Sequence, residues 1–134
     1  MDRIAQCHCG QLKAIASGEP ERVYVCHCQA CQRRTGAIIH NGSSWLKERV
    51  RIAGEERIYA RLADSGFEIR FHFCPHCGTS VLWEGDRNPL VCGIAIGCFA
   101  DPDFPPPTQS GWEESMHRWL GLPAETEHFA QGRN

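Results

Sequence analysis

The sequence lacks a hydrophobic run long enough to cross a bilayer. Its longest apolar stretch, residues 90–100, is about half of the roughly 20 residues that a membrane-spanning helix needs. The amino terminus, Met1-Asp2-Arg3, is not followed by the apolar region of a secretory signal. We therefore expect a soluble, cytoplasmic protein with no membrane partner.

The sequence also lacks a large excess of charge of either sign. Fourteen Lys and Arg residues stand against sixteen Asp and Glu residues, which gives a formal net charge of -2, and no basic block is dense enough to hold a phosphate backbone. We expect no nucleic-acid partner. A chain of 134 residues is too short for two independent domains, so the prediction is one domain over residues 1–134.

Cysteine, in contrast, is abundant, with nine residues in the chain. Disulfides seldom persist in a reducing compartment, so cysteines at this density without an export signal indicate metal ligands or catalytic thiols. Cys92 and Cys98 lie in an apolar segment, where a free cysteine behaves as a small core residue. The other seven form three clusters: Cys7-His8-Cys9, Cys26-His27-Cys28-Gln29-Ala30-Cys31 and Cys74-Pro75-His76-Cys77.

The spacing within the clusters favours zinc, which takes four ligands in a tetrahedron and accepts two thiolates from one tight turn. The Cys74/Cys77 pair has the composition of a zinc knuckle and supplies two ligands, and the Cys7/Cys9 pair supplies two more. Joining Cys7/Cys9 to Cys26/Cys28 would also give four ligands, so spacing alone leaves the pairing open. A redox dithiol is the alternative at Cys74/Cys77, but an alternating strand precedes the pair where a βαβ unit is typical.

The middle cluster differs because it offers three thiolates, Cys26, Cys28 and Cys31, within six residues. Three protein ligands and one open position are typical of a zinc ion that takes part in catalysis. The alternative is a second closed site with a remote fourth ligand. The candidates for that ligand are Cys92, Cys98, His27 and His40.

Alternation of apolar and polar residues dominates the chain and is clearest at residues 67–73, which predicts a strand with one buried and one solvated face. Weaker alternation between turn-prone segments predicts further short strands, and such spacing favours antiparallel sheets. Residues 90–99 are expected to form a central strand buried on both faces, with close backbone approach at Gly93 and Gly97. The weaker strands are expected at residues 12–16, 23–25, 50–52, 58–62 and 80–83.

Helical turns are predicted in only two places, residues 29–34 and 113–120. In the second, Trp112, Met116 and Trp119 are spaced to share one face. We expect this stripe to pack on the domain or on a second subunit, which leaves a homodimer open. The proline-rich residues 101–107 are expected to form an extended arm on the surface.

The ordered set of cysteine motifs resembles the glutathione-dependent formaldehyde-activating enzyme family over nearly the whole chain. The resemblance extends to Ala95-Ile96-Gly97, which leads into Ala100-Asp101-Pro102. It implies a mainly β fold of small antiparallel sheets around zinc, sometimes called a beta-tent, with little helix. The motifs that carry it are Cys7-His8-Cys9-Gly10, Cys26-His27-Cys28-Gln29-Ala30-Cys31-Gln32-Arg33-Arg34-Thr35-Gly36-Ala37 and Phe73-Cys74-Pro75-His76-Cys77-Gly78-Thr79.

The resemblance also implies which cysteines share each metal ion. The residues that match the outer motifs would form a structural zinc site, and those that match the middle motif would form a catalytic zinc site. The structural set is Cys7, Cys9, Cys74 and Cys77, and the catalytic set is Cys26, Cys28 and Cys31.

The activity that the resemblance implies is the condensation of formaldehyde with glutathione to S-hydroxymethylglutathione by a carbon–sulfur lyase. Zinc is thiophilic, so a substrate thiol in its open position would lose a proton near neutral pH and add as a thiolate to formaldehyde or another small aldehyde. No catalytic residue beyond the metal ligands and no other cofactor is identified. The candidates for protonating the product oxygen are Arg33, Arg34, Thr35 and His27.

A non-catalytic zinc module that binds thiols or a protein partner is the alternative function. It would hold all of its zinc in closed sites. An exchangeable fourth ligand that a thiol can replace distinguishes the enzyme from the module.

One substitution in each predicted site should separate their roles. Cys28→Ser is expected to abolish turnover while leaving one zinc ion and a folded domain. Cys74→Ser is expected chiefly to unfold the domain, because a structural zinc ion contributes on the order of 10 kcal/mol. Metal analysis and circular dichroism of both variants measure the difference. The assignment is wrong if both variants stay folded and lose equal amounts of metal.

Overall fold

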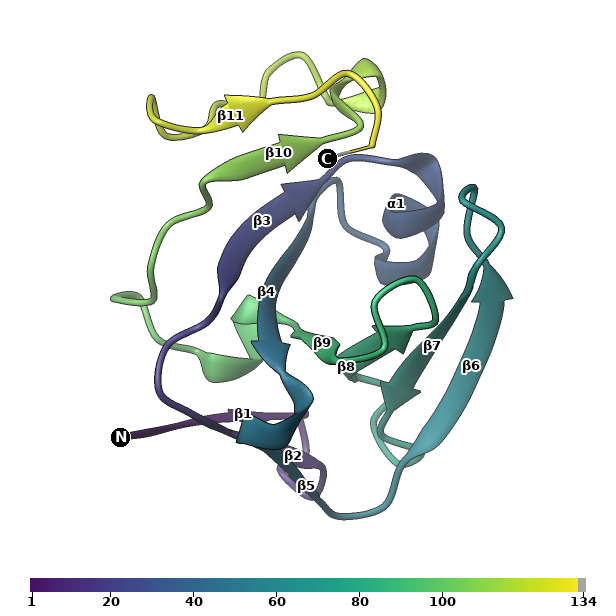
Figure 1. The fold of residues 1–134 in the computed structure, drawn as a ribbon, viewed down its shortest axis with the longest axis vertical. Helices are drawn as coiled ribbons and strands as arrows, with labels where there is room; N and C mark the ends of the chain where they lie inside the picture. Colours follow the sequence, from purple (N-terminus) through teal and green to yellow (C-terminus); the bar gives the residue numbers. More distant parts are fainter. Residues whose placement is uncertain (133–134) are drawn as a thin grey trace.

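The computed structural model describes residues 1–132, which form two β-sheets and one short α-helix (Figure 1). The predicted mainly β class with little helix is confirmed. The expected domain also includes Arg133 and Asn134, which lie outside the described residues. Within residues 1–132, no helix combines the length and hydropathy needed to span a membrane.

Eleven strands are found between residues 1 and 132. They are β1 (Asp2–Gln6), β2 (Lys13–Ser17), β3 (Arg22–Cys26), β4 (His40–Leu46), β5 (Val50–Ala53), β6 (Arg57–Leu62), β7 (Glu68–Phe73), β8 (Ser80–Gly85), β9 (Val91–Ile94), β10 (Gln109–Gly111) and β11 (Glu127–His128). The α-helix α1 spans Gln29–Thr35, and three 3-10 turns are η1 (Lys47–Arg49), η2 (Ile96–Phe99) and η3 (Glu113–Ser115).

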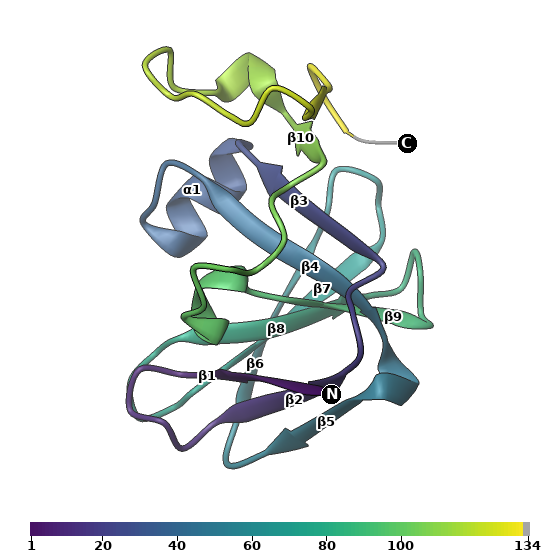
Figure 2. The ribbon, with the colours of Figure 1, turned by 90° about the vertical axis from the view of Figure 1, so that its left-hand side faces the viewer.

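The smaller sheet has the antiparallel order β1-β2-β5, and the larger has the order β11-β10-β3-β4-β9-β8-β7-β6. Both views place β10 at the end of the molecule opposite the small sheet (Figures 1 and 2). Pairing is antiparallel except that β10 runs parallel to both β3 and β11. This parallel pairing was not expected, and it arises because the chain after β9 returns along the surface before it joins the sheet.

The returning arm covers residues 101–107 and contains no helix or strand, but it is not extended throughout as expected, because the Phe104 N–H closes a turn on the Asp101 carbonyl at 3.1 Å. Phe104 anchors it, since this side chain is buried and stacks on Phe99 with 4.8 Å between ring centroids. Thr108 then donates its N–H to the Val23 carbonyl at 3.0 Å, which starts the pairing with β3.

The predicted strands at residues 12–16, 23–25, 50–52, 58–62, 67–73 and 80–83 all occur, with ends shifted by one or two residues. β4 was missed because its sequence, HNGSSWL, shows no alternation. Its small residues are buried beneath large rings instead: a Cβ on Gly42 would lie 2.6 Å from the Tyr24 ring, and Ser43 is fully buried. The small residues of β4 leave room for aromatic rings from neighbouring strands to pack closely against it.

The expectation of one strand over residues 90–99 is partly wrong. β9 ends at Ile94, and the chain then enters η2. The Gly97 N–H donates to Asn41 Oδ1 at 3.2 Å, and Cys98 N–H turns back to the Ala95 carbonyl. These bonds take the place of hydrogen bonds to a neighbouring strand. The second half of the apolar run therefore lies at the edge of the core.

Of the helical turns expected over residues 113–120, only the single 3-10 turn η3 forms, at Glu113–Ser115. Trp112 has φ 57°, a left-handed conformation that reverses the chain after β10. The next N–H groups bond to another segment, with Glu113 donating to the Phe129 carbonyl at 3.0 Å. Trp119 is 75% exposed, so the expected stripe does not form one packed face.

The polar face of β7 is less solvated than predicted. His72 is buried, with Nδ1 2.9 Å from Glu56 Oε2 and Nε2 2.9 Å from Glu84 Oε2. Burial alone would raise the pKa of Glu84, but hydrogen bonds from Lys47, Arg70 and His72 lower it to about 2. A network of opposite charges therefore covers this face of the sheet.

Two glycines of the apolar run give a matched test of the packing. Gly93→Ala is expected to cost about 1–3 kcal/mol or more, because its Cβ would overlap the Trp83 indole. Gly97→Ala is expected to change stability little, because its Cβ would meet nothing within 4 Å. Urea unfolding of both variants measures the difference. Equal stabilities would contradict the described contact between β9 and Trp83.

Candidate functional site

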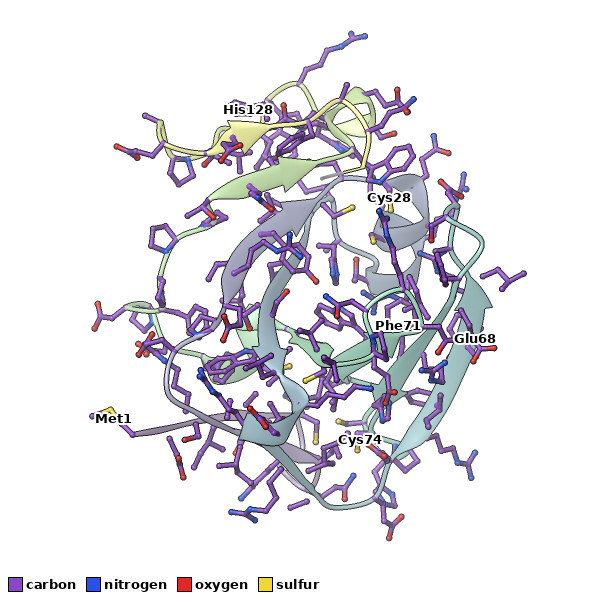
Figure 3. The ribbon with its side chains drawn as sticks, in the orientation of Figure 1. Met1, Cys28, Glu68, Phe71, Cys74 and His128 are labelled. Carbon is purple, nitrogen blue, oxygen red and sulfur yellow. The ribbon has the colours of Figure 1, made fainter. Side chains whose placement is uncertain are left out.

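Seven of the nine cysteines lie in two sulfur clusters toward opposite ends of the molecule, marked by Cys28 and Cys74 in Figure 3. The first, here called the four-sulfur cluster, contains Cys7, Cys9, Cys74 and Cys77. The second, here called the sulfur triplet, contains Cys26, Cys28 and Cys31. Within each cluster all Sγ atoms lie within 4.8 Å of one another. The alternative grouping of Cys7/Cys9 with Cys26/Cys28 is not formed.

The four-sulfur cluster joins the two sheets. Cys7 and Cys9 follow β1, and Cys74 and Cys77 lie in the turn between β7 and β8. The Sγ atoms of Cys7 and Cys9 are 3.6 Å apart, and those of Cys9 and Cys74 are 3.7 Å apart. Zn–S bonds of about 2.3 Å in a tetrahedron require sulfurs about 3.8 Å apart. The four sulfurs therefore fit one zinc ion.

Hydrogen-bond donors surround these sulfurs. Cys74 Sγ accepts from the His76 backbone N–H at 3.3 Å and from Gln11 Nε2 at 3.0 Å. Hydrogen bonds from the Thr79 hydroxyl and backbone lower the pKa of Cys77 to about 5. Gly78, with φ 81°, makes the turn that exposes such N–H groups, as its position after the knuckle predicts. The donors stabilise thiolates, which are the form that binds a metal.

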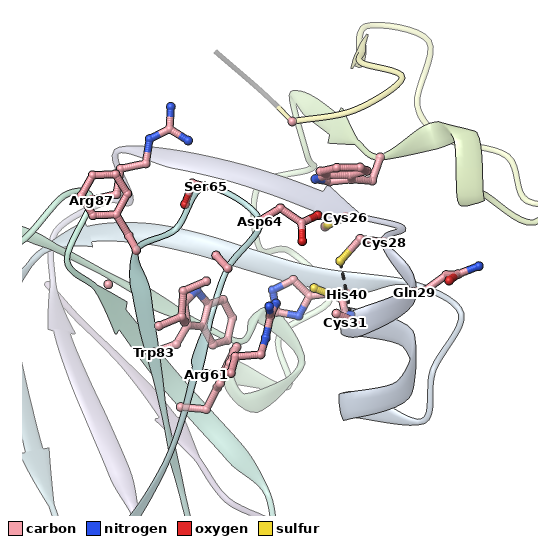
Figure 4. Close-up of a pocket in the computed structure, with 18 of the residues that line it drawn as sticks. Cys26, Cys28, Gln29, Cys31, His40, Arg61, Asp64, Ser65, Trp83 and Arg87 are labelled. Carbon is pink, nitrogen blue, oxygen red and sulfur yellow. Dashed lines mark hydrogen bonds between the residues drawn. The ribbon is translucent and has the colours of Figure 1, made fainter.

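The sulfur triplet is built from one local segment. β3 ends at Cys26, and Cys28 then caps α1, its Sγ accepting the Cys31 N–H at 3.3 Å (dashed in Figure 4). Gly36, with φ 70°, ends the helix. The predicted helical turn at residues 29–34 is thus confirmed. One strand end and one helix start thus supply all three sulfurs from six consecutive residues.

Three thiols in so small a space cannot all ionise in the absence of a cation. Hydrogen bonds from the thiols of Cys26 and Cys31 lower the pKa of Cys28 to about 2. The same contacts raise the pKa of Cys26 and, together with burial, that of Cys31. Without metal the triplet thus carries one negative charge near neutral pH. A divalent cation would permit all three thiolates.

The triplet forms part of the wall of a cleft of about 670 Å³. This volume lies within the range of small-molecule sites. Arg61, Asp64, Ser65, His40 and Trp83 line the same cleft, and Figure 4 shows the Asp64 side chain directed toward Cys26 and Cys28 and His40 beside Cys31. Cys7 of the four-sulfur cluster borders a second cleft, of about 580 Å³, which it shares with Cys98.

The base of the cleft is a cluster of packed rings. Trp83 Nε1 donates to the Tyr24 hydroxyl at 3.1 Å, and the His40 and Trp83 ring centroids are 4.6 Å apart. Gly42 and Gly93 make room for these rings, because a side chain at either position would overlap them. The ring positions are therefore set by backbone packing.

Two guanidinium groups lie over the ring of Phe71, which lines the cleft, although Arg34 itself borders the second cleft. The Arg34 Cζ is 4.0 Å from the Phe71 ring centroid, and Nη2 donates to His40 Nδ1 at 2.9 Å, so this nitrogen of His40 carries no proton. The Arg61 Cζ is 5.9 Å from the same Phe71 centroid. The charge of Arg61 also contributes to the low pKa of Cys28. The triplet therefore faces a fixed positive charge across the cleft.

The residues considered as a fourth ligand lie elsewhere. His40 pairs with Cys26 across β3 and β4, but no His, Cys, Asp or Glu ligand atom among residues 1–132 lies within 4.8 Å of all three sulfurs. Cys92 is a buried core residue, as predicted, and Cys98 borders the second cleft. His27 is fully buried, with Nε2 2.8 Å from Ser110 Oγ. Among residues 1–132, the triplet therefore offers three ligand atoms for one metal ion.

The candidate proton donors are also separated by the fold. Arg33 borders the cleft beside the triplet, whereas Arg34 and Thr35 border the second cleft. The Thr35 hydroxyl donates back to the Cys31 carbonyl at 2.7 Å. Arg61 was not predicted as a site residue, because nothing in its local spacing distinguishes it from a solvated strand residue.

Comparison with known proteins gives a matching family model and similar solved structures. The family model described as glutathione-dependent formaldehyde-activating enzyme matches residues 2–120. Among solved structures, the chain is similar to the crystal structure of a Rhodobacter sphaeroides protein, at 19% identity and a TM-score of 0.53, with 71% of this chain and 85% of that chain covered. At that identity, the likeness concerns the fold alone. No match was found among curated proteins.

The charge state of the triplet predicts its response to pH. Zinc binding near neutral pH should release about two protons, from Cys26 and Cys31, because Cys28 is already ionised. The affinity should then rise about 100-fold per pH unit. Calorimetry in buffers of different ionisation enthalpy measures the protons, using protein that already holds one equivalent of zinc in the four-sulfur cluster. A pH-independent affinity would contradict the proposed sharing of charge.

Proposed function

The chain belongs to the glutathione-dependent formaldehyde-activating enzyme family, and from this premise we propose that it is a zinc-dependent carbon–sulfur lyase. It joins a thiol, glutathione or a related compound, to formaldehyde or another small aldehyde. One observation carries the proposal: three sulfurs that have no fourth Cys, His, Asp or Glu ligand among residues 1–132 border a cleft large enough for a small molecule.

The two sulfur clusters have different roles in this proposal. The four-sulfur cluster supplies a full set of ligands between the two sheets, which suits a structural zinc ion. The sulfur triplet supplies three ligands, which leaves one position for a substrate. When bound there, zinc supplies a thiophilic Lewis acid that lets a substrate thiol ionise near neutral pH.

The reaction forms one carbon–sulfur bond. The substrate sulfur adds its electron pair to the aldehyde carbon, the carbonyl π pair moves to oxygen, and the proton lost by the thiol ends on that oxygen. The product is a hydroxymethyl thioether when the aldehyde is formaldehyde. The reverse reaction breaks the same bond and returns both substrates.

The chain's own residues would orient the substrates. The rigid ring base of Tyr24, His40 and Trp83 offers apolar contact for the thiol's carbon atoms. Arg61, whose charge reaches Cys28, is placed to stabilise negative charge that develops on the aldehyde oxygen. Arg33 also borders the cleft and offers a second cation, which would bind a carboxylate group of the thiol substrate.

Matched cysteine substitutions test the proposal. Zinc-loaded protein is expected to accelerate the exchange between free formaldehyde and its glutathione adduct, which NMR exchange spectroscopy measures. Cys31→Ala should lower this rate to that of the uncatalysed reaction because it removes one sulfur of the triplet. Cys92→Ala, at an equally buried cysteine outside both clusters, should keep most of it.

The same assay separates the enzyme from a non-catalytic zinc module. Wild-type protein that holds two zinc ions but does not accelerate exchange of glutathione or other small thiols would be such a module. Equal rates for the two alanine variants would show that the triplet is not the reaction site.

A further inference from the structure

His27 lies between two sulfurs of the triplet but faces away from them. The residue is fully buried, and its Nε2 is 2.8 Å from Ser110 Oγ on β10. Its Nδ1 has no hydrogen-bond partner among residues 1–132. Ser110 is therefore the single polar anchor of this ring, and the orientation of the ring depends on it.

The anchor continues through two further residues. The nearby Ser110 hydroxyl helps to lower the pKa of the Glu113 carboxylate, and Glu113 Oε2 lies 2.7 Å from His128 Nδ1. A carboxylate can only accept a hydrogen bond, so the Ser110 hydroxyl directs its hydrogen toward Glu113. Its oxygen then accepts a hydrogen bond from the His27 Nε2–H. Burial and this hydrogen bond to Ser110 together hold the His27 ring in one orientation.

Backbone bonds hold the same two segments together. The His27 N–H donates to the Gly111 carbonyl at 3.0 Å. The Gln32 side-chain amide of α1 donates both to the His27 carbonyl at 2.9 Å and to the Ser115 carbonyl at 3.1 Å. The triplet segment is therefore attached to residues 110–115 on both sides of Cys28.

We propose that Ser110 and Glu113 are positioning residues that hold the turn between Cys26 and Cys28, through His27, in the arrangement that binds metal. This inference rests on the proposed role of the triplet as a zinc site. Partners beyond the ligands that orient them typically contribute 10- to 100-fold to metal affinity. Residues 110–115 thus support the metal site although they contribute no ligand to it.

Ser110→Ala tests the inference because it removes the acceptor for His27 Nε2. Zinc affinity is measured by competition with a chromophoric chelator, and Cys28→Ser identifies the step that belongs to the triplet. The affinity of the triplet is expected to fall about 10- to 100-fold, with that of the four-sulfur cluster unchanged. Glu113→Ala, at a more accessible position, should cause a smaller loss of the same kind.

Ser43→Ala is the matched control. Ser43 is equally buried, and its hydroxyl donates to the Ile94 carbonyl at 3.0 Å and accepts from Trp45 Nε1 at 2.9 Å. This variant should lower the thermal unfolding temperature but leave the zinc affinity of the triplet unchanged. Equal affinity losses in Ser43→Ala and Ser110→Ala would overturn the inference, since the effect would then be general destabilisation.

The outcomes also separate this inference from the proposed function. If the wild-type protein catalyses the exchange and Ser110→Ala keeps full affinity at the triplet, only the inference fails. If Ser110→Ala loses affinity but the wild-type protein catalyses no exchange, the proposed function fails and the inference stands. If the wild-type triplet binds no zinc, both fail.

Discussion

Compensation of thiolate charge is the constraint on which the rest of the structure depends. Sulfurs within 4.8 Å of one another in two separate places can ionise together only beside a cation or a dense set of donors. At the four-sulfur cluster, donors and four ligands are both present, so one ion would satisfy the site. At the triplet, donors are fewer and the cleft stays open. The difference in ligand number sets the difference in proposed role.

The larger sheet places the parts of the site. β3 ends in the triplet, β4 and β9 supply the small residues under the ring base, and β6 and β7 bring Arg61 and Phe71 to the cleft. β7 ends at Phe73, directly before Cys74, so one strand connects the cleft to the four-sulfur cluster. A metal ion in that cluster would hold this strand against the small sheet and thereby support the cleft wall.

The C-terminal segment completes the arrangement from the other side. Its parallel pairing with β3 places Ser110 behind His27, and the left-handed Trp112 turns the chain so that Trp112, Glu114 and Ser115 border the cleft. A non-glycine residue in that conformation is strained and persists where the surrounding structure requires it. Backbone hydrogen bonds from residues 112–114 to residues 129–131 hold Trp112 in this conformation.

The sequence by itself determined the class of fold, most strands, the short helix and the candidate metal ligands, because alternation and cysteine spacing are local properties of the chain. It did not determine β4, whose small residues make sense only beneath Tyr24 and Trp83, or the end of β9 at Ile94. Spacing left the grouping of Cys7/Cys9 with Cys74/Cys77 open, and the family resemblance implied the grouping that the structure forms. Only the tertiary structure brought Arg61 to the triplet and Ser110 to His27. These contacts join residues far apart in the chain, and no local pattern records which distant segments become neighbours.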